Sequence, residues 1–192
     1  YEVKTADGSS YKAERVISCL PSYAAAGLVS QLDSAFSSEL DSIPYCQIEM
    51  THLSYKKSEV KGNIEGFGFL VPEVEGKPLL GAVINSSAFD HRAAKDEMTF
   101  TLFSKPDRGH SSELAQQEIE KWLKISGLPT FRAVTKWERA IPQFEIGHTK
   151  ILQRIAQFEA KENIYISGNF RSGVSVGDCV KFAKEISNLL IT

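Results

Sequence analysis

The stretch GNFRSGVSVGDCVKFAKEISNLL, residues 168–190, places a glycine-rich turn directly before a helical pattern near the end of the sequence. The first N–H groups of a helix have no partner inside it, so such a turn can direct several of them at one ligand. The pattern predicts contact with a phosphate or another electron-rich group. A plain turn between a strand and a helix is the alternative interpretation of this segment by itself.

The turn does not match the common nucleotide-binding loops. Gly168 and Gly173 have the separation of a P-loop, but Val174 and Ser175 occupy the positions that require Lys and Ser or Thr. The segment GFGFLVP at 66–72 has two glycines, but it lacks the third glycine and the following helix of a dinucleotide-binding turn. Neither segment therefore has the surrounding residues that a nucleotide-binding loop requires.

Composition indicates an ordinary soluble globular protein, with 42% hydrophobic and 24% charged residues among 192. A net charge of −2 gives no field that would favour nucleic acid, so no nucleic-acid partner is expected. No apolar run approaches the ~20 residues of a membrane-spanning helix.

No residue pattern predicts a metal site or a catalytic side chain. Cys19, Cys46 and Cys179 lack metal-ligand spacing, and the odd count leaves at least one thiol unpaired. The four histidines form no pair with ligand spacing, and no G-x-S-x-G elbow occurs. Catalytic and metal-ligating residues are therefore both expected to be absent.

Hydrophobic periodicity predicts an α+β fold. The first 20 residues read as two strands around the Asp7-Gly8 turn, the second running to Leu20, and residues 22–43 read as two short helices. From residue 45 a period of two predicts four strands of an antiparallel sheet. The remaining pattern predicts a helix from 112 to 127, a strand at 130–140, a loop at 141–148, a helix at 150–162, a strand at 163–168 and a closing helix after 174.

The segment WERAIPQFEIGH, residues 137–148, combines an aromatic residue at the end of a strand with a turn fixed by Pro142. Trp137 and this loop could belong to a common binding site. Trp137 as core filler is the alternative.

Four segments together, FGFLVP, INSSAF, AIPQFEIGH and GNFRSGVSVGDCV, resemble the protoporphyrinogen oxidase family of flavoproteins, which lies within the amine-oxidase-type superfamily. The resemblance extends over nearly the whole chain and includes AERVISCLP near its start. The glycine-rich segment occurs across the superfamily, whereas the IPQFEIGH and FGFLVP pair is similar to this family in particular.

The resemblance implies an FAD cofactor that carries out the chemistry and a protein that positions the substrate. It implies backbone contacts to the flavin from Val174, Ser175 and Val176, and a glycine at 173 that lets the flavin approach the backbone. The further cofactor contacts that it implies are Trp137, Gly168 and Asn169. For the substrate cavity, it places Leu70 and Phe89 on the wall.

The same resemblance implies protoporphyrinogen IX as substrate, oxygen as electron acceptor, peripheral contact with the mitochondrial inner membrane, and a homodimer as a further expectation. Asp90 departs from the family, which commonly has proline there. The dinucleotide-binding G-x-G-x-x-G unit does not occur in the sequence. We therefore expect a C-terminal portion that needs the rest of its FAD-binding domain and is inactive alone.

Within that portion, residues 1–44 and 141–192 are expected to belong to the FAD-binding domain and residues 45–140 to a substrate-binding domain. Two alternatives remain at this point. The first is another FAD-dependent amine oxidase or desaturase of the superfamily. The second is a non-catalytic module that binds porphyrin or docks on a separate flavin domain.

Overall fold

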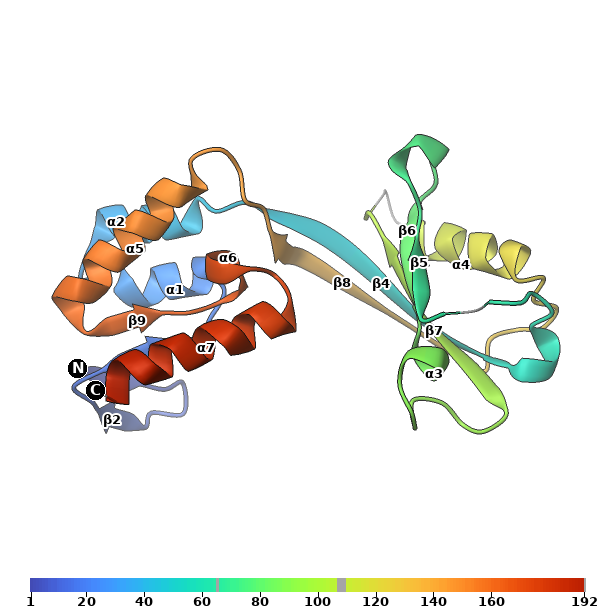
Figure 1. Ribbon diagram of the computed structural model, residues 1–192, viewed down its shortest axis with the longest axis horizontal. Helices are drawn as coiled ribbons and strands as arrows, with labels where there is room; N and C mark the ends of the chain where they lie inside the picture. Colours follow the sequence, from blue (N-terminus) through green and yellow to red (C-terminus); the bar gives the residue numbers. More distant parts are fainter. Residues whose placement is uncertain (65, 107–109, 192) are drawn as a thin grey trace. The chain divides into compact units, whose positions relative to one another are not determined.

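The computed structural model describes residues 1–64, 66–106 and 110–191 and divides the chain into two units (Figure 1). The first unit consists of Tyr1–Tyr45 together with Ile141–Thr192, and the second of Cys46–Ala140. The assignment of these parts to flavin and substrate stays a prediction.

The elements of the first unit come from both ends of the chain. They are β1 (Glu2–Lys4), β2 (Ser10–Lys12), β3 (Val16–Ser18), α1 (Ser22–Val29), α2 (Ser34–Asp41), α5 (His148–Glu162), β9 (Ile164–Ile166), α6 (Asn169–Ser172) and α7 (Val176–Ile191). The second unit contains β4 (Tyr45–Lys56), η1 (Lys57–Glu59), β5 (Gly68–Leu70), η2 (Glu73–Glu75), β6 (Leu79–Ile84), α3 (Asn85–Ala88), β7 (Glu97–Ser104), α4 (Ser111–Trp122) and β8 (Phe131–Pro142), with β4 and β8 each crossing its boundary.

The first 20 residues differ from the predicted hairpin. β1 and β2 do pair antiparallel around Asp7-Gly8, but the second strand ends at Lys12. The apolar run at 16–18 forms β3 and pairs parallel with β9, with Val16 opposite Ile164. The prediction of one continuous second strand was wrong because the apolar run finds its partner about 150 residues away, in a segment that local pattern cannot associate with it.

The core of the first unit lies among α1, α2, α5 and β9. Asp33 caps α2 by accepting a hydrogen bond from the Phe36 N–H at 2.9 Å, as its position before the helical pattern suggests. Phe36 is buried against Phe158 of α5, with ring centroids 4.5 Å apart. The fully or nearly buried residues of this core are Ala25, Ala26, Val29, Phe36, Leu40, Ile43, Ile155, Phe158, Ile164, Ile166 and Phe170.

The second unit is built on a five-stranded sheet of order β5-β6-β7-β4-β8 (Figure 1). β4 pairs antiparallel with β7, and β6 pairs antiparallel with both β5 and β7. α4 packs on one face of this sheet, so the α+β prediction and the antiparallel sheet are confirmed. The buried residues of this core are Leu53, Tyr55, Leu79, Ala82, Ile84, Phe100, Leu102, Ala115, Ile119 and Leu123. No helix within the described residues is both long and apolar enough to cross a membrane.

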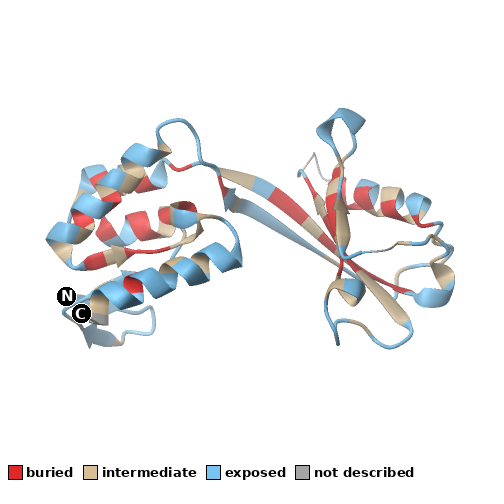
Figure 2. Cartoon of the chain, in the orientation of Figure 1, coloured by how far each residue is buried: buried red, intermediate tan, exposed pale blue. Residues whose placement is uncertain are grey.

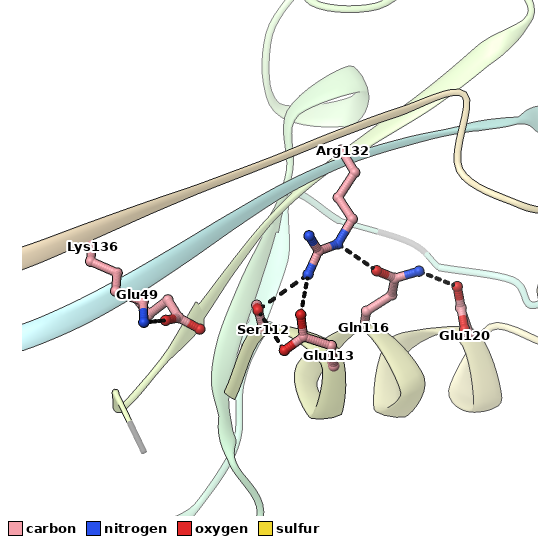
Figure 3. A network of polar contacts seen from close by, with 7 residues as sticks. All are labelled: Glu49, Ser112, Glu113, Gln116, Glu120, Arg132 and Lys136. Atoms are coloured by element: carbon pink, nitrogen blue, oxygen red, sulfur yellow. Dashed lines mark hydrogen bonds and ion pairs between the residues drawn. The ribbon is translucent and has the colours of Figure 1, made fainter. Parts of the chain in front are cut away.

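Polar side chains connect α4 to the strands beside it (Figure 3). Arg132 of β8 donates to Gln116 Oε1 at 3.0 Å and to Glu113 Oε1 at 3.0 Å. Gln116 in turn donates to Glu120 Oε1 at 2.8 Å, and the same oxygen accepts the Tyr55 hydroxyl at 2.7 Å. Burial, with the Glu120 carboxylate beside it, raises the pKa of Tyr55, so its hydroxyl keeps the proton that it donates.

Tyr55→Phe is expected to lower the free energy of unfolding by roughly 1–2 kcal/mol, because the partly buried Glu120 oxygen loses a donor from the buried Tyr55 while Gln116 remains. Urea unfolding of the full-length protein measures the change. Tyr11→Phe is the matched control, since Tyr11 is 61% exposed, and it should stay within about 0.5 kcal/mol of the parent protein. Equal effects of the two substitutions would show that the Tyr55 hydrogen bond adds no stability.

Candidate functional site

The glycine-rich turn borders a cavity of about 550 Å³ in the first unit. β3 and β9 run parallel, so the residues after both strands, Cys19 and Ser167, lie at the same edge of this small sheet. Ligands of α/β folds commonly bind at the carboxyl ends of parallel strands. The cavity is lined by Cys19, Leu20, Pro21, Ser167, Gly168, Asn169, Val174, Val176, Cys179, Val180 and Ala183.

The first residue of α7 and the two residues before it leave backbone donors unused. The N–H groups of Val174, Ser175 and Val176 make no hydrogen bond within the described residues. The Ser175 hydroxyl accepts the Asp178 N–H at 3.0 Å and donates to the Asp178 carboxylate at 2.6 Å, which fixes the first turn of α7. A rigid helix start with free N–H groups, beside a largely apolar cavity, suits a planar ligand with an electron-rich edge.

Two glycines have backbone conformations that other residues avoid. Gly168 has φ +153°, and a Cβ there would contact the Phe170 ring. Gly173 has φ +141°, and its Cβ would collide with the Asp178 side chain. The structure thus adds a local reason for glycine at 173, because a side chain would disturb both the turn and the cap of α7.

Arg171 of α6 holds this turn against three other elements. Its guanidinium forms a bidentate ion pair with Glu159 of α5 and also donates to the Ile166 carbonyl of β9. Its Cζ lies 4.7 Å from the ring centroid of Phe182 in α7. Glu159 completes the arrangement by accepting the Ile166 N–H at 2.8 Å. The turn is therefore positioned by largely buried charge-assisted hydrogen bonds as well as by its glycines.

The loop at 141–148 reaches the same region of the first unit. His148 Nε2 lies 2.7 Å from the Phe170 carbonyl, which can only accept, so the nitrogen carries the proton. Phe144 packs edge-on against the His148 ring at 4.7 Å between centroids. A second cavity of about 450 Å³ lies between this loop and Gly173. The IPQFEIGH and GNFRSGV segments, about 20 residues apart in sequence, are thereby in contact.

The sheet of the second unit has one face that α4 covers and one face that points away from α4. Tyr55 of β4 is buried and donates to Glu120 of α4. Glu49, six residues earlier on the same face of β4, is also buried, and Lys136 of β8 reaches it at 3.3 Å (Figure 3). Adjacent residues of a strand point to opposite faces. His52 and Trp137 therefore lie on the face away from α4, which we call the open face. Figure 2 shows that β4 carries the buried stretches, whereas β8 beside it is mostly exposed.

Leu70 also lies on the open face. It pairs with Gly81, which pairs with Phe103, which in turn pairs with Met50 of β4. Residues directly opposite one another share a face, so this row extends across four strands on the side away from α4. Leu70 is 88% exposed and borders a shallow cavity of about 310 Å³ with Phe67, Phe69, Val83 and Phe103 among its lining residues.

The structure distributes the predicted contacts over the two units. Gly168, Asn169, Val174 and Val176 line one cavity, and Gly173 and Ser175 shape the turn beside it. In the second unit Trp137 and Leu70 lie on the open face, whereas Phe89 follows α3 and is 60% exposed. Sequence reasoning missed the cavity residues Leu20, Pro21, Val180 and Ala183 and the clamp of Arg171 and Glu159. The signal for Leu20 and Pro21 was their place at the end of an apolar strand.

Residues 1–191 match the family model of the flavin-containing amine oxidoreductases, and the chain belongs to this family. Protoporphyrinogen oxidase 1, chloroplastic, of Arabidopsis thaliana is 29% identical over 95% of the chain and 38% of its own length. Protoporphyrinogen oxidase, mitochondrial, of Nicotiana tabacum is 28% identical over 82% of the chain and 33% of its own length. The resemblance read from the sequence is thereby confirmed.

A crystal structure from Exiguobacterium sp. 255-15 superposes with a TM-score of 0.75 at 21% sequence identity, over 99% of this chain and 43% of that one. This likeness shows the fold. The chain spans less than two fifths of the length of the two curated relatives named above.

The residues present fit the flavin that the family implies. The free N–H groups at the start of α7 are donors of the kind that the oxygen and nitrogen edge of an isoalloxazine accepts from, and the cavity beside them has the mostly apolar lining that suits its rings. The fit concerns this edge alone, since the sequence contains no G-x-G-x-x-G turn for the pyrophosphate.

Proposed function

We propose that these residues form the C-terminal part of an FAD-dependent oxidase that converts protoporphyrinogen IX to protoporphyrin IX. The observation that carries the proposal is the unpaired N–H row of Val174, Ser175 and Val176 beside the cavity, in a chain whose curated relatives are protoporphyrinogen oxidases. By itself, the chain is proposed to lack activity, because it has no turn for the FAD pyrophosphate.

Flavin, when bound, supplies the hydride acceptor of the reaction. The chain's own residues bind the flavin and orient the substrate. The N–H groups before α7 stabilise negative charge at the flavin edge, and Arg171 with Glu159 keeps them in place. Leu70 and Phe89 provide apolar surface for the macrocycle, and Trp137 is proposed as a further flavin contact.

The proposal extends to the partners and the location. Oxygen is the proposed electron acceptor, the rest of the FAD-binding domain the proposed intramolecular partner, and a homodimer the proposed assembly. The two curated relatives named above are a chloroplastic and a mitochondrial enzyme, which supports an organellar location. Peripheral attachment to the mitochondrial inner membrane is the finer proposal.

The visible spectrum of the purified full-length protein, mixed anaerobically with protoporphyrinogen IX and then exposed to air, tests the proposal. We expect the flavin band to bleach and then to return together with a porphyrin Soret band. A flavin band that bleaches with amines and not with the porphyrinogen would instead identify another oxidase of the family. Porphyrin formation at the spontaneous rate without any flavin band would favour the binding module.

A further inference from the structure

A polar cluster interrupts the apolar open face of the second unit. His52 Nδ1 of β4 lies 3.0 Å from the Thr101 hydroxyl of β7, and Asn85 Nδ2 donates to the same hydroxyl oxygen at 3.0 Å. Thr101 is 4% exposed, whereas His52 and Asn85 are partly exposed. Three polar side chains from three elements therefore meet at one point of the sheet.

The hydrogen bonds of the cluster are compatible with a histidine donor on the open face. Asn85 donates to one lone pair of Thr101 Oγ1, and in one arrangement of the cluster the hydroxyl hydrogen donates to His52 Nδ1. Nδ1 is then an acceptor, and the proton of the neutral imidazole lies on Nε2. Nε2 makes no hydrogen bond within the described residues, so its N–H group is an unused donor on the open face.

The cluster also contains a buried polar atom without a partner. Asn85 Oδ1 is buried and accepts no hydrogen bond from the described residues. Exchanging the amide oxygen and nitrogen would leave the amine buried and unpaired instead, so neither orientation completes the cluster. Buried polar groups in native proteins nearly always have a hydrogen-bond partner, so the Asn85 amide needs a water or a ligand group to complete it.

The cluster adjoins the elements that carry both residues expected to contact substrate, the Leu70 row of the sheet and the short helix before Phe89. The row Gly68, Val83, Thr101 and His52 adjoins the row that contains Leu70, two residues along the strands, or roughly 7 Å away. Asn85 of the cluster is also the first residue of the short helix α3. The Phe89 N–H donates to the Asn85 carbonyl at 3.1 Å, so Phe89 lies one helical turn from the cluster.

We propose that His52 donates a hydrogen bond from Nε2 to a carboxylate of the ligand on the open face, with Thr101 and Asn85 holding the tautomer that this contact requires. The inference rests on the proposed function, whose tetrapyrrole bears carboxylates on an otherwise apolar ring system. A carboxylate is the acceptor that gains most from such a donor in an apolar wall. Arg92, whose Cζ lies 6.0 Å from the Phe89 ring centroid, adds a positive charge near Phe89. Asp90, the next residue after Phe89, adds a negative charge there. His52 is the donor of the polar cluster that this proposal assigns to the carboxylate.

The test compares protoporphyrinogen IX with its dimethyl ester on the full-length flavoprotein. We expect His52→Phe to raise KM for the diacid about 10-fold, the effect of one hydrogen bond to a charged group, with little change in kcat. KM for the ester should be the same in both proteins. His52→Gln, which places an amide N–H near the position of Nε2, should restore most of the diacid affinity. Thr101→Val, which frees the tautomer, should raise KM for the diacid alone, by less than His52→Phe.

A matched control is His110→Gln, at an exposed position before α4 whose side chain makes no capping hydrogen bond, and neither substrate should respond to it. Equal changes for diacid and ester in His52→Phe, or no change in either, would overturn the carboxylate contact.

If the full-length parent protein oxidises neither substrate, the proposed function fails while the contact can still be decided. Porphyrin fluorescence titrations with protoporphyrin IX and its dimethyl ester then give dissociation constants directly. A preference for the diacid that disappears in His52→Phe supports the contact. A preference that the substitution leaves unchanged, or no preference in the parent protein, overturns it.

Discussion

Arg171→Ala is expected to lower the free energy of unfolding by about 3–5 kcal/mol, because it leaves the Glu159 carboxylate buried without its cation. The side chains of Arg171 and Glu159 are only 17% and 11% exposed, so water replaces the lost partner poorly. The substitution also removes the donor to the Ile166 carbonyl and the contact with the Phe182 ring. Thermal and urea unfolding of the full-length protein would show the loss.

Lys161→Ala is the matched control for this prediction. Lys161 pairs with Glu162 at the end of α5, but its side chain is 75% exposed, so its loss should cost less than about 0.5 kcal/mol. Glu159→Gln adds a second comparison, because it keeps the shape of the side chain and removes its charge. If Arg171→Ala destabilises the protein no more than Lys161→Ala, the clamp contributes only as much as a surface ion pair.

The local sequence pattern was sufficient to predict an element where that segment buries one face against a neighbouring element. The alternation in β4 and the apolar stripe of α4 each reflect a core that forms within the second unit, so their residues carry the period of the structure that they adopt. The strand at 16–18 shows the limit. Its apolar residues indicated a strand, but nothing local indicates that it pairs parallel with residues 164–166.

The candidate site likewise contains residues that the local sequence reveals and residues that only the fold reveals. The glycine-rich turn is recognisable because glycine and an N-terminal cap are local requirements of one short segment. Nothing in the local sequence marks Arg171 as part of the site, since its partner Glu159 is in a different element. His52 looked like a lone histidine on a strand, because Asn85 and Thr101 lie 33 and 49 residues further along the chain. Contacts of this range need the fold.

Gly173→Ala is expected to weaken flavin binding about 5- to 150-fold, which corresponds to the 1–3 kcal/mol cost of a strained backbone conformation. The glycine has φ +141°, and an added Cβ would collide with Asp178, whose carboxylate accepts the Ser175 hydroxyl at 2.6 Å. In the free protein the turn can relax to avoid this strain. In the proposed complex, binding must restore the conformation in which the N–H groups of residues 174–176 face the flavin edge, so the strain lowers the affinity.

Flavin fluorescence titration of the full-length apoprotein measures this effect, and Gly8→Ala is its matched control. Gly8 also has a positive φ, +86°, but a Cβ there meets nothing within 4 Å and the residue lies in the exposed β1–β2 hairpin. Both substitutions impose backbone strain, yet only the one at 173 acts on the turn that opens α7. Gly8→Ala should therefore reduce stability slightly and leave flavin affinity unchanged. Equal flavin affinity in the two variants would contradict the assignment of Val174, Ser175 and Val176 as flavin contacts, because it would mean that the turn can be distorted without loss of binding.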